Sequence, residues 1–302
     1  MSDSKTIGFI GLGVMGEPIC RNMLEKSGLP FLVSDLSEAP VARLVEKGAK
    51  SASISEIFAT CDIVFLSLPG GPQVEAVLAG AGGCLEAGKA GQVVVDMSTT
   101  PVGLTRQLAD ALAQKGILFA DAPVARTRQA AEAGTLSIMV GAADEVFATI
   151  RPLLDMAASD VTHCGAIGCG QVVKIINNMV LFETVVALSE ALTIGEAAGV
   201  DRGLLFETLS KGSADSFALR NHGMKAMIPA AFPVNAFSTE YAMKDASYAL
   251  ALAADTGVVA HGAELAMARM NKAKEAGFGR EYFPVLAKVV DRRDEGGAAS
   301  GA

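Results

Sequence analysis

A glycine pattern near the N-terminus constrains the fold of this 302-residue chain more than any other feature. Gly11, Gly13 and Gly16 form a G-x-G-x-x-G pattern that directly follows an apolar run and opens a helical stretch. In that setting the first glycine permits a tight turn, the second lets a pyrophosphate approach the backbone, and the third lets helix and strand pack closely. We therefore predict a dinucleotide phosphate loop at Gly11, Leu12, Gly13, Val14, Met15 and Gly16, against the alternative of a plain strand-to-helix turn.

An acidic residue stands where such a loop would need a ribose ligand. Asp35 ends the second predicted strand, about 20 residues beyond the glycines, which is the usual place for a carboxylate that binds the adenosine ribose hydroxyls. A carboxylate there would repel a 2′-phosphate, and no Arg follows it immediately. We therefore predict NAD rather than NADP as the cofactor. If Asp35 were instead a helix N-cap, the choice of cofactor would stay open.

The first half of the chain alternates short β-rich runs with amphipathic helical stretches. This alternation is typical of βαβ units and of a mostly parallel sheet with helices on both faces. The runs are almost continuously apolar, as expected when both faces of a sheet are covered. The predicted strands are Thr6–Ile10, Pro30–Ser34, Ile63–Ser67, Gln92–Asp96, Ile117–Asp121 and Leu136–Val140.

The pattern becomes purely helical after Gly170. We predict an uninterrupted helix over 171–198 that is apolar on nearly all sides, ending near Gly199, with Asp201 as the N-cap of the next helix. The fold class is thus α/β: a Rossmann-type doubly wound parallel sheet over 1–165, an all-helical C-terminal domain over 166–292, and a disordered polar tail over 293–302.

Composition excludes several function classes. Lys and Arg number 25 and Asp and Glu 33, and this net charge of −8 argues against a nucleic-acid binder. The mean hydropathy is positive at +0.38, but charged residues interrupt the longest apolar segment, so we expect no membrane span and no signal peptide. Five scattered cysteines fit a reducing cytoplasm, and His163, Cys164 and Cys169 lack the spacing of a metal site, so no metal is expected.

Three polar residues share one face of the long predicted helix. Lys174, Asn177 and Asn178 have i, i+3, i+4 spacing, and polar groups on an apolar helix are costly unless they are satisfied or functional. A position near a helix N-terminus, together with burial, would lower the pKa of the lysine and make it a better proton donor and acceptor near neutral pH. The alternative is a polar groove bonded to loops or water.

Taken together, these motifs resemble those of the β-hydroxyacid dehydrogenases over nearly the whole chain. This family includes 3-hydroxyisobutyrate dehydrogenase and tartronate semialdehyde reductase. The matching segments are Gly8–Gly16, Asp96–Thr99, Asp121–Val124 followed by Gly134–Leu136, Gly168–Asn178 with its Gly-x-Gly-x-x-x-Lys-x-x-Asn-Asn pattern, and Lys244-Asp245. The resemblance is specific for fold and reaction type and much less so for the substrate.

The resemblance implies a role for each matching residue. Lys174 would be the catalytic acid/base, Asn177 and Asn178 would bind the substrate, and Lys244 would lie near the nicotinamide. Leu68 and Pro69 would form a turn against the cofactor, and Ser98 and Thr99 would lie beside the nicotinamide ribose. The expected reaction transfers a hydride between NAD and a small anionic 3-hydroxy acid or its semialdehyde.

One segment departs from the family pattern. Most members follow Pro-Val with Ser-Gly-Gly, whereas this chain has Ala125, Arg126 and Thr127. A guanidinium can hold a carboxylate or sulfonate with two parallel hydrogen bonds, so we expect Arg126 to bind the anionic end of the substrate unless it faces solvent or pairs with Glu132. The Arg-Thr pair resembles sulfolactaldehyde reductases of the same family. Phe217 is a secondary substrate-binding candidate, in a loop that the family places over the substrate.

Other functions remain as alternatives. An imine reductase would share the fold but usually replaces the catalytic lysine, and a non-catalytic NAD-binding sensor would need no Lys-Asn-Asn face. A sulfonate-specific 3-sulfolactaldehyde reductase is the alternative within the family. The apolar helix also suggests a subunit interface, and the family implies a homodimer or homotetramer; neither nucleic acid nor a membrane is an expected partner.

Overall fold

The computed structural model describes residues 5–234 and 236–290. The chain forms two compact units, a sheet unit of residues 1–174 and a helical unit of residues 175–302, and the division falls inside the long helix. The predicted polar tail over 293–302 lies outside the described residues.

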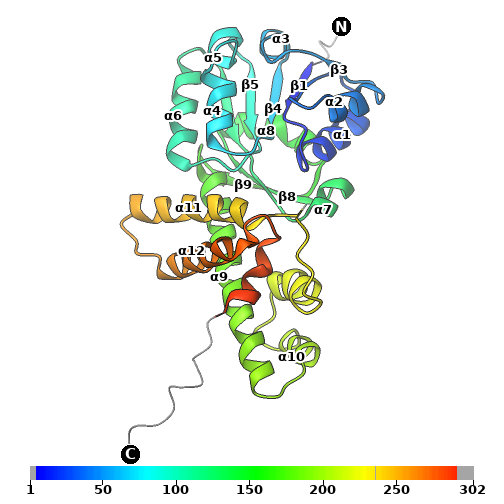
Figure 1. Cartoon of the computed structure of the whole chain (residues 1–302). Coiled ribbons are helices and arrows are strands. Elements are labelled where there is room, and N and C mark those ends of the chain that lie inside the picture. The colour runs from blue at the N-terminus through cyan, green and yellow to red at the C-terminus, as the bar shows by residue number, and fades with distance from the viewer. Residues whose placement is uncertain (1–4, 235, 291–302) are drawn as a thin grey trace, which may run out of the picture. The chain divides into compact units, whose positions relative to one another are not determined.

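A twisted sheet forms the centre of the sheet unit (Figure 1). In the part of the chain that is described, its strand order is β3-β2-β1-β4-β5-β6-β8-β7, and β9 pairs with β8. All six predicted strands are present, each within one residue at either end. The strands are β1 Ile7–Ile10, β2 Phe31–Ser34, β3 Lys50–Ser51, β4 Ile63–Leu66, β5 Val93–Asp96, β6 Leu118–Asp121, β7 Val124–Ala125, β8 Leu136–Gly141 and β9 Ala158–Gly165.

Strands β3, β7 and β9 were not predicted. Two of them are only two residues long, and β9 is largely polar and only partly buried, so none of the three shows an apolar run. The six strands from β3 to β6 are parallel, as expected, whereas β8 pairs antiparallel with β6 and β7. The mostly parallel, doubly wound sheet is therefore confirmed, with an antiparallel addition at one edge.

The direction of strand progression reverses between β1 and β4. From β1 the chain proceeds outward to β2 and β3, and then returns to place β4, β5 and β6 on the other side. In open α/β sheets, ligands bind at such a switch point, beyond the carboxyl ends of the strands. The loops that follow β1, β4 and β5 are therefore the segments of this unit to search for a binding site.

Helices cover both faces of the sheet (Figure 1). Because alternate residues of a strand point to opposite faces, Phe9 of β1 packs into the core with α1 and α8, and Ile10 packs into the core with α3, α4 and α6. The helices of this unit are α1 Gly16–Ser27, α2 Glu38–Val45, α3 Ile54–Thr60, α4 Gly71–Ala79, α5 Cys84–Ala87, α6 Val102–Ala113, α7 Arg128–Ala133 and α8 Asp144–Leu154.

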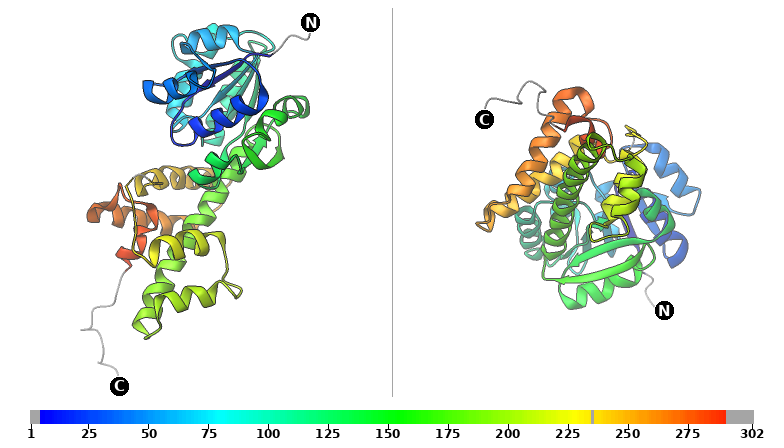
Figure 2. Two further views of the ribbon diagram at one scale, coloured as in Figure 1. Left: turned by 90° about the vertical axis from the view of Figure 1, so that its right-hand side faces the viewer. Right: turned by 90° about the horizontal axis from the view of Figure 1, so that it is seen from below.

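The helical unit packs around the long helix α9 (Figure 2). Phe182 and Val185 of α9 share one core with Phe206, Met270 and Phe283. The predicted cap of α10 is confirmed, because Asp201 accepts a hydrogen bond from the Leu204 N–H. The elements are α9 Cys169–Ala197, α10 Arg202–Leu209, the π-helix η1 Leu219–Met227, α11 Thr239–Asp255, α12 His261–Ala273, the π-helix η2 Lys274–Phe278 and the 3-10 helix η3 Phe283–Val289.

Helix α9 is long and apolar enough, by length and composition, to cross a membrane. It is the one such helix in residues 5–234 and 236–290, and 39% of its most apolar window is buried inside the protein. A core helix of a soluble protein passes the same test, so this is weak evidence for a span. Its buried Phe182, Val185 and Leu192 form part of the core of the helical unit.

Candidate active site

The loop after β1, from Gly11 to Gly16, leaves open space beside its backbone, and we call it the glycine cradle. Gly11 has a φ of +93°, and a Cβ there would overlap the Ser67 carbonyl oxygen, while a Cβ on Gly16 would overlap the Gly11 carbonyl oxygen. Gly13 is exposed, and a Cβ added to it would meet no heavy atom within 4 Å. The first and third glycines therefore serve the tight turn and the packing, and the second leaves open space beside the backbone.

Helix α1 begins at Gly16, three residues after Gly13. The N-cap residue of α1 is Met15, and no side chain makes a capping hydrogen bond to this end of the helix. Uncapped N–H groups and the helix dipole together favour a phosphate. The observed loop thus fits the pyrophosphate of a dinucleotide, since the backbone supplies donors and Gly13 supplies room.

Asp35 lies at the carboxyl end of β2, beside the loop. Its Oδ2 accepts a hydrogen bond from the Leu12 N–H at 2.5 Å, and its Oδ1 accepts one from the Ser37 N–H at 2.7 Å. The N-cap of α2 is Ser37, so the alternative role of Asp35 as that cap does not apply. Each carboxylate oxygen keeps a second lone pair with which it can accept a ribose hydroxyl.

The loops after β4 and β5 are joined to each other near the same edge. The Leu68 N–H donates to Ser98 Oγ at 2.9 Å, and the Ser67 N–H donates to the Ile10 carbonyl at 2.9 Å. The predicted cofactor segments at Leu68 and at Ser98 and Thr99 are therefore held together beside the glycine loop, as the switch-point topology requires.

Two buried aspartates end neighbouring strands and organise these loops. Asp96 of β5 accepts hydrogen bonds from the Ser98 N–H and from Thr100 Oγ1. Asp121 of β6 stands opposite Asp96 in the strand register. Burial raises the pKa of each carboxyl group to about 6, because the low-dielectric interior disfavours the charge.

Asp121 also binds the start of α9. Its Oδ1 accepts from the Gly168 N–H at 2.6 Å, and its Oδ2 accepts from the Gln171 N–H at 2.8 Å. The first amides of a helix have no intrahelical partner, so a carboxylate at this end satisfies them and complements the helix dipole. Asp121 thus attaches the first turn of α9 to the carboxyl edge of the sheet.

Lys174 lies less than one turn beyond Gln171 on α9 and is half-buried. Asn178 follows it at i+4, so the two share a face of the continuous helix, as predicted. Asn178 is buried, and its Nδ2 donates to Asp245 Oδ2 at 2.8 Å, while Asn177 Nδ2 donates to Asn178 Oδ1 at 3.1 Å. The two asparagine side chains of the polar face are therefore hydrogen-bonded within the helical unit.

Lys244 occupies an aromatic and acidic setting within the helical unit. Its Nζ lies 4.0 Å from the centroid of the Tyr241 ring, 5.4 Å from that of Tyr248, and 3.1 Å from Asp245 Oδ1. Phe217, the predicted substrate residue of this unit, is 47% exposed, and the centroid of its ring lies 5.9 Å from that of the His222 ring.

Arg126 makes contacts other than those the sequence suggested. Its Nη1 donates to the Thr135 carbonyl and to Ser159 Oγ, each at 2.6 Å, and its Nη2 pairs with Asp160 at 2.7 Å. Glu132, the alternative partner considered from the sequence, pairs with Arg128 instead. The hydrogen bonds of Arg126 use both hydrogens of Nη1 and one of Nη2, so Nε–H and the second Nη2 hydrogen could donate to an anion. Binding of a substrate acid by Arg126 stays a prediction.

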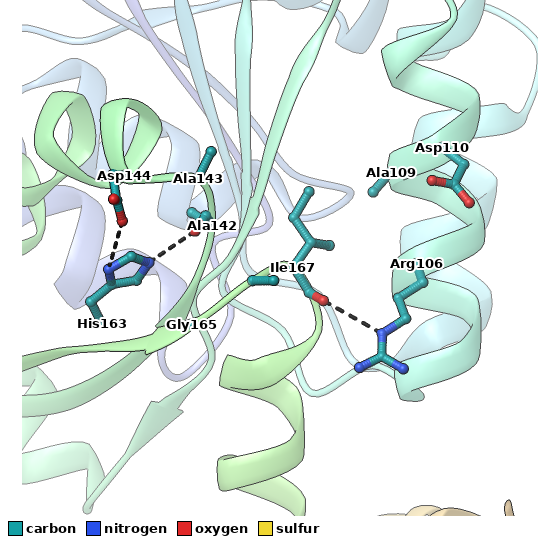
Figure 3. Close-up of a pocket in the computed structure, with 10 residues that line it drawn as sticks. Arg106, Ala109, Asp110, Ala142, Ala143, Asp144, His163, Gly165 and Ile167 are labelled. Carbon is teal, nitrogen blue, oxygen red and sulfur yellow. Dashed lines mark hydrogen bonds and ion pairs between the residues drawn. The ribbon is translucent and has the colours of Figure 1, made fainter.

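A separate surface hollow of about 640 Å³ lies near the start of α9. Figure 3 shows Arg106 on α6 on one side and His163 with Asp144 on the other. Arg106 Nε donates to the Ile167 carbonyl at 3.5 Å, and His163 bonds the Ala142 carbonyl at 2.9 Å. None of the predicted site residues lines this hollow, and the polar groups named here bond to protein neighbours.

In residues 5–234 and 236–290, no group of three or more His, Cys, Asp or Glu side chains could hold a metal ion. Sequence reasoning missed the organising roles of Asp96, Asp121, Gln171 and Asp245. The signal available for the two aspartates was their position, because each ends an apolar strand next to a predicted cofactor or helix segment. Nothing local distinguishes Gln171 from an ordinary helix residue.

The fold and the glycine loop together define a protein of the dinucleotide-binding type: a doubly wound sheet with a glycine loop at its switch point and an acidic residue directly after β2. Comparison with known proteins agrees. Residues 6–165 match the model of the NAD-binding domain of 6-phosphogluconate dehydrogenase, and residues 168–290 match the NAD-binding model of NADP-dependent 3-hydroxyisobutyrate dehydrogenase.

Relatives match over most of the chain. The chain is 38% identical over 293 residues to 2-(hydroxymethyl)glutarate dehydrogenase of Eubacterium barkeri, covering 97% of each protein. It is 37% identical over 219 residues to 2-hydroxy-3-oxopropionate reductase of Escherichia coli, covering 72% of this chain and 74% of that one. Mycobacterium tuberculosis 3-hydroxyisobutyrate dehydrogenase, solved with L-serine, superposes with a TM-score of 0.84 at 28% identity, covering 94% of this chain and 98% of that one.

The chain belongs to the β-hydroxyacid dehydrogenase family. It is accordingly an oxidoreductase that uses a nicotinamide dinucleotide, as the glycine loop indicated.

Proposed function

We propose that this protein transfers a hydride between NAD and a small anionic 3-hydroxy acid or semialdehyde, with Lys174 as the acid/base. The observation that carries the proposal is the attachment of the first turn of α9 to the segment after β5. Gln171 bonds the backbone at Ser98 and Thr100, and Lys174 follows on the same helix. This attachment supports Lys174 as the proton-transfer group, because the lysine follows an anchored turn at the sheet edge that carries the glycine loop.

Residues of the sheet unit would hold the cofactor, which supplies the hydride chemistry when bound. The loop from Gly11 to Gly16 would bind the pyrophosphate, Asp35 the adenosine ribose, and the segments at Leu68 and Pro69 and at Ser98 and Thr99 the nicotinamide half. Asp35 would place a negative charge against a 2′-phosphate, and this favours NAD over NADP.

The protein's own contribution is position and one proton. Lys174 would donate a proton to the substrate carbonyl oxygen in the reduction direction and accept the hydroxyl proton in the oxidation direction. On the resemblance alone, we assign Asn177, Asn178 and Phe217 to the substrate and Lys244 to the cofactor. The hydrogen bond from Asn178 to Asp245 would fix the orientation of that amide.

The substrate class follows from the relatives and from the departure after β7. The names of the relatives describe acids with a hydroxymethyl group or an aldehyde. In this chain Ala125 lacks the hydroxyl that most members offer, Arg126 adds a cation, and Thr127 brings a hydroxyl two positions later. We propose a small 3-hydroxy acid or semialdehyde that carries a carboxylate and, as the runner-up, a sulfonate such as sulfolactaldehyde, because a guanidinium can bind either anion.

The test is oxidation of NADH by a panel of C3 to C4 semialdehydes, including one sulfonate, and the reverse reaction with the hydroxy acids. Lys174→Ala should lower kcat by at least about 100-fold, since a general acid contributes roughly 10²–10⁴. Lys115→Ala, which removes an exposed lysine of the same unit, is the control and should leave kcat unchanged. NADH binding without turnover on any substrate would instead favour the sensor, and turnover of an imine alone the imine reductase.

Cofactor choice has its own test. Parallel assays with NAD and NADP should give the larger kcat/KM with NAD, and Asp35→Ser should narrow the difference by weakening NAD binding and admitting the 2′-phosphate. A wild-type preference for NADP would refute the assignment of Asp35 to the ribose.

We also propose a cytoplasmic homodimer or homotetramer. All five cysteines are unpaired with one another, in keeping with a reducing compartment. Val173, Ile176 and Val180 expose apolar side chains along α9, and such a stripe is a usual subunit interface. Light scattering of the purified protein should give a mass of two or four chains, and a monomer at micromolar concentration would contradict the interface.

A further inference from the structure

One buried glutamine at the start of α9 makes more tertiary hydrogen bonds than a helix needs for its own stability. Gln171 is fully buried in the sheet unit. Its Nε2 donates to the Ser98 carbonyl at 2.8 Å, its Oε1 accepts from the Thr100 N–H at 3.1 Å, and its own N–H donates to Asp121 at 2.8 Å. The residue therefore links the helix to the ends of two neighbouring strands.

The two side-chain bonds lie on either side of Thr99. A single amide that bonds the preceding carbonyl and the following N–H fixes the position and the plane of the backbone between them. Asp96 holds the same segment by two further hydrogen bonds, which its carboxylate accepts from the Ser98 N–H and from Thr100 Oγ1. The segment that would face the nicotinamide ribose is thus held from two directions.

Lys174 is three residues further along the same rigid helix. A helix rises about 1.5 Å per residue, so the lysine lies about one turn from the anchored position. We propose that Gln171 is a positioning residue, which sets the separation between Lys174 and the cofactor-facing segment at Thr99; this inference rests on the proposed function. Catalysis is sensitive to such a separation, because a misplacement of about 1 Å can cost roughly 100-fold in rate.

The chemistry of the side chain explains why an amide is needed. The two hydrogen bonds on either side of Thr99 require one donor and one acceptor at the end of a three-carbon side chain. Gln171→Glu would turn an acceptor toward the Ser98 carbonyl, close to two buried carboxylates. Gln171→Met would keep the volume and leave the Ser98 carbonyl and the Thr100 N–H without these partners.

The chain offers a matched control for burial alone. Gln92, just before β5, is also buried, and its Nε2 donates to the Phe58 and Cys61 carbonyls at 2.9 and 2.7 Å. It lies at the amino end of β5, whereas Ser98 and Thr100 follow the carboxyl end. Gln92→Met therefore removes an equivalent bridge at the sheet edge away from the glycine cradle.

The experiment compares Gln171→Met and Gln92→Met in stability, NADH affinity, kcat, and the pH profile of kcat/KM. We expect both to lose a similar amount of stability. Gln171→Met alone should lower kcat by about tenfold to 100-fold and move the lysine limb of the pH profile, with the NADH dissociation constant changed by less than about threefold.

Several outcomes would overturn the inference. If Gln171→Met keeps kcat and pH profile, or if Gln92→Met changes both equally, Gln171 is structural only. Should Gln171→Met not fold, Gln171→Asn decides, since it keeps both polar groups on a shorter side chain and should still lower kcat and shift the profile. Full activity of Lys174→Ala would instead refute the proposed function, and the two failures are thus distinguishable.

Discussion

Replacing Gly13 by Ala tests the cradle more sharply than any other single change. In the protein without cofactor, the new Cβ meets no heavy atom within 4 Å, and the φ of Gly13 is not in the left-handed region. The substitution therefore adds no clash, and the reduced freedom of the unfolded chain should raise the free energy of unfolding by about 0.4–1 kcal/mol.

The effect on the cofactor should be opposite. The methyl group would fill the space through which the pyrophosphate approaches the backbone, and overpacking of this kind costs about 1–3 kcal/mol. That penalty corresponds to a rise of about fivefold to 150-fold in the NADH dissociation constant. Denaturant unfolding of the apoprotein and fluorescence titration with NADH measure the two quantities separately.

Two further glycines provide the controls. Gly103 in α6 also has open space around its Cβ position, so Gly103→Ala should stabilise the protein and leave NADH affinity unchanged. Gly11→Ala should lose stability even without cofactor, because φ is +93° and the Cβ overlaps the Ser67 carbonyl. An unchanged NADH affinity in Gly13→Ala would refute the reasoning that this loop binds the pyrophosphate.

Three other predictions concern buried or strained groups. Burial raises the pKa of Asp121 to about 6 from an unfolded value near 3.8, so ionisation of this carboxyl group costs the folded state about 3 kcal/mol. The difference in unfolding free energy between wild type and Asp121→Asn should therefore shift against wild type as the pH rises from 4 to 6, and stay constant above pH 6. A shift in favour of wild type over that range, measured by urea unfolding, would contradict this prediction. Arg126 has a φ of +87°, so the free energy of unfolding of Arg126→Gly, measured in urea, should exceed that of Arg126→Ala by about 1 kcal/mol. Both variants should raise KM for acidic substrates if the guanidinium binds them. Equal KM values in wild type and both variants would show that it does not. Asn178→Asp would place a second carboxylate against Asp245 and should lower the free energy of unfolding by roughly 3 kcal/mol at pH 8. The loss should be smaller at pH 4, where protonation of one carboxylate restores a hydrogen-bond donor. A loss that is the same at both pH values would contradict this contact.

Local sequence signals predicted the elements whose cause is local. The apolar runs over 63–66 and 93–95 predicted strands, because both faces of a parallel sheet are covered and its strands are almost continuously apolar. The glycine loop was predictable because its chemistry resides in three neighbouring residues. Strand β9 was missed, since its residues are mostly polar and pair with β8 only through the tertiary fold.

The sequence by itself therefore determined the doubly wound sheet, the phosphate loop, the long helix and the Lys-Asn-Asn face, because periodicity and spacing within a few residues specify each of them. Only the tertiary structure decided how these parts are held. Asp96 and Asp121 become neighbours through strand register, Gln171 reaches back across more than 70 positions to Ser98, and Arg126 finds Asp160 on β9. Such partners are set by which loops the sheet brings to one edge, and no local pattern in the chain encodes that.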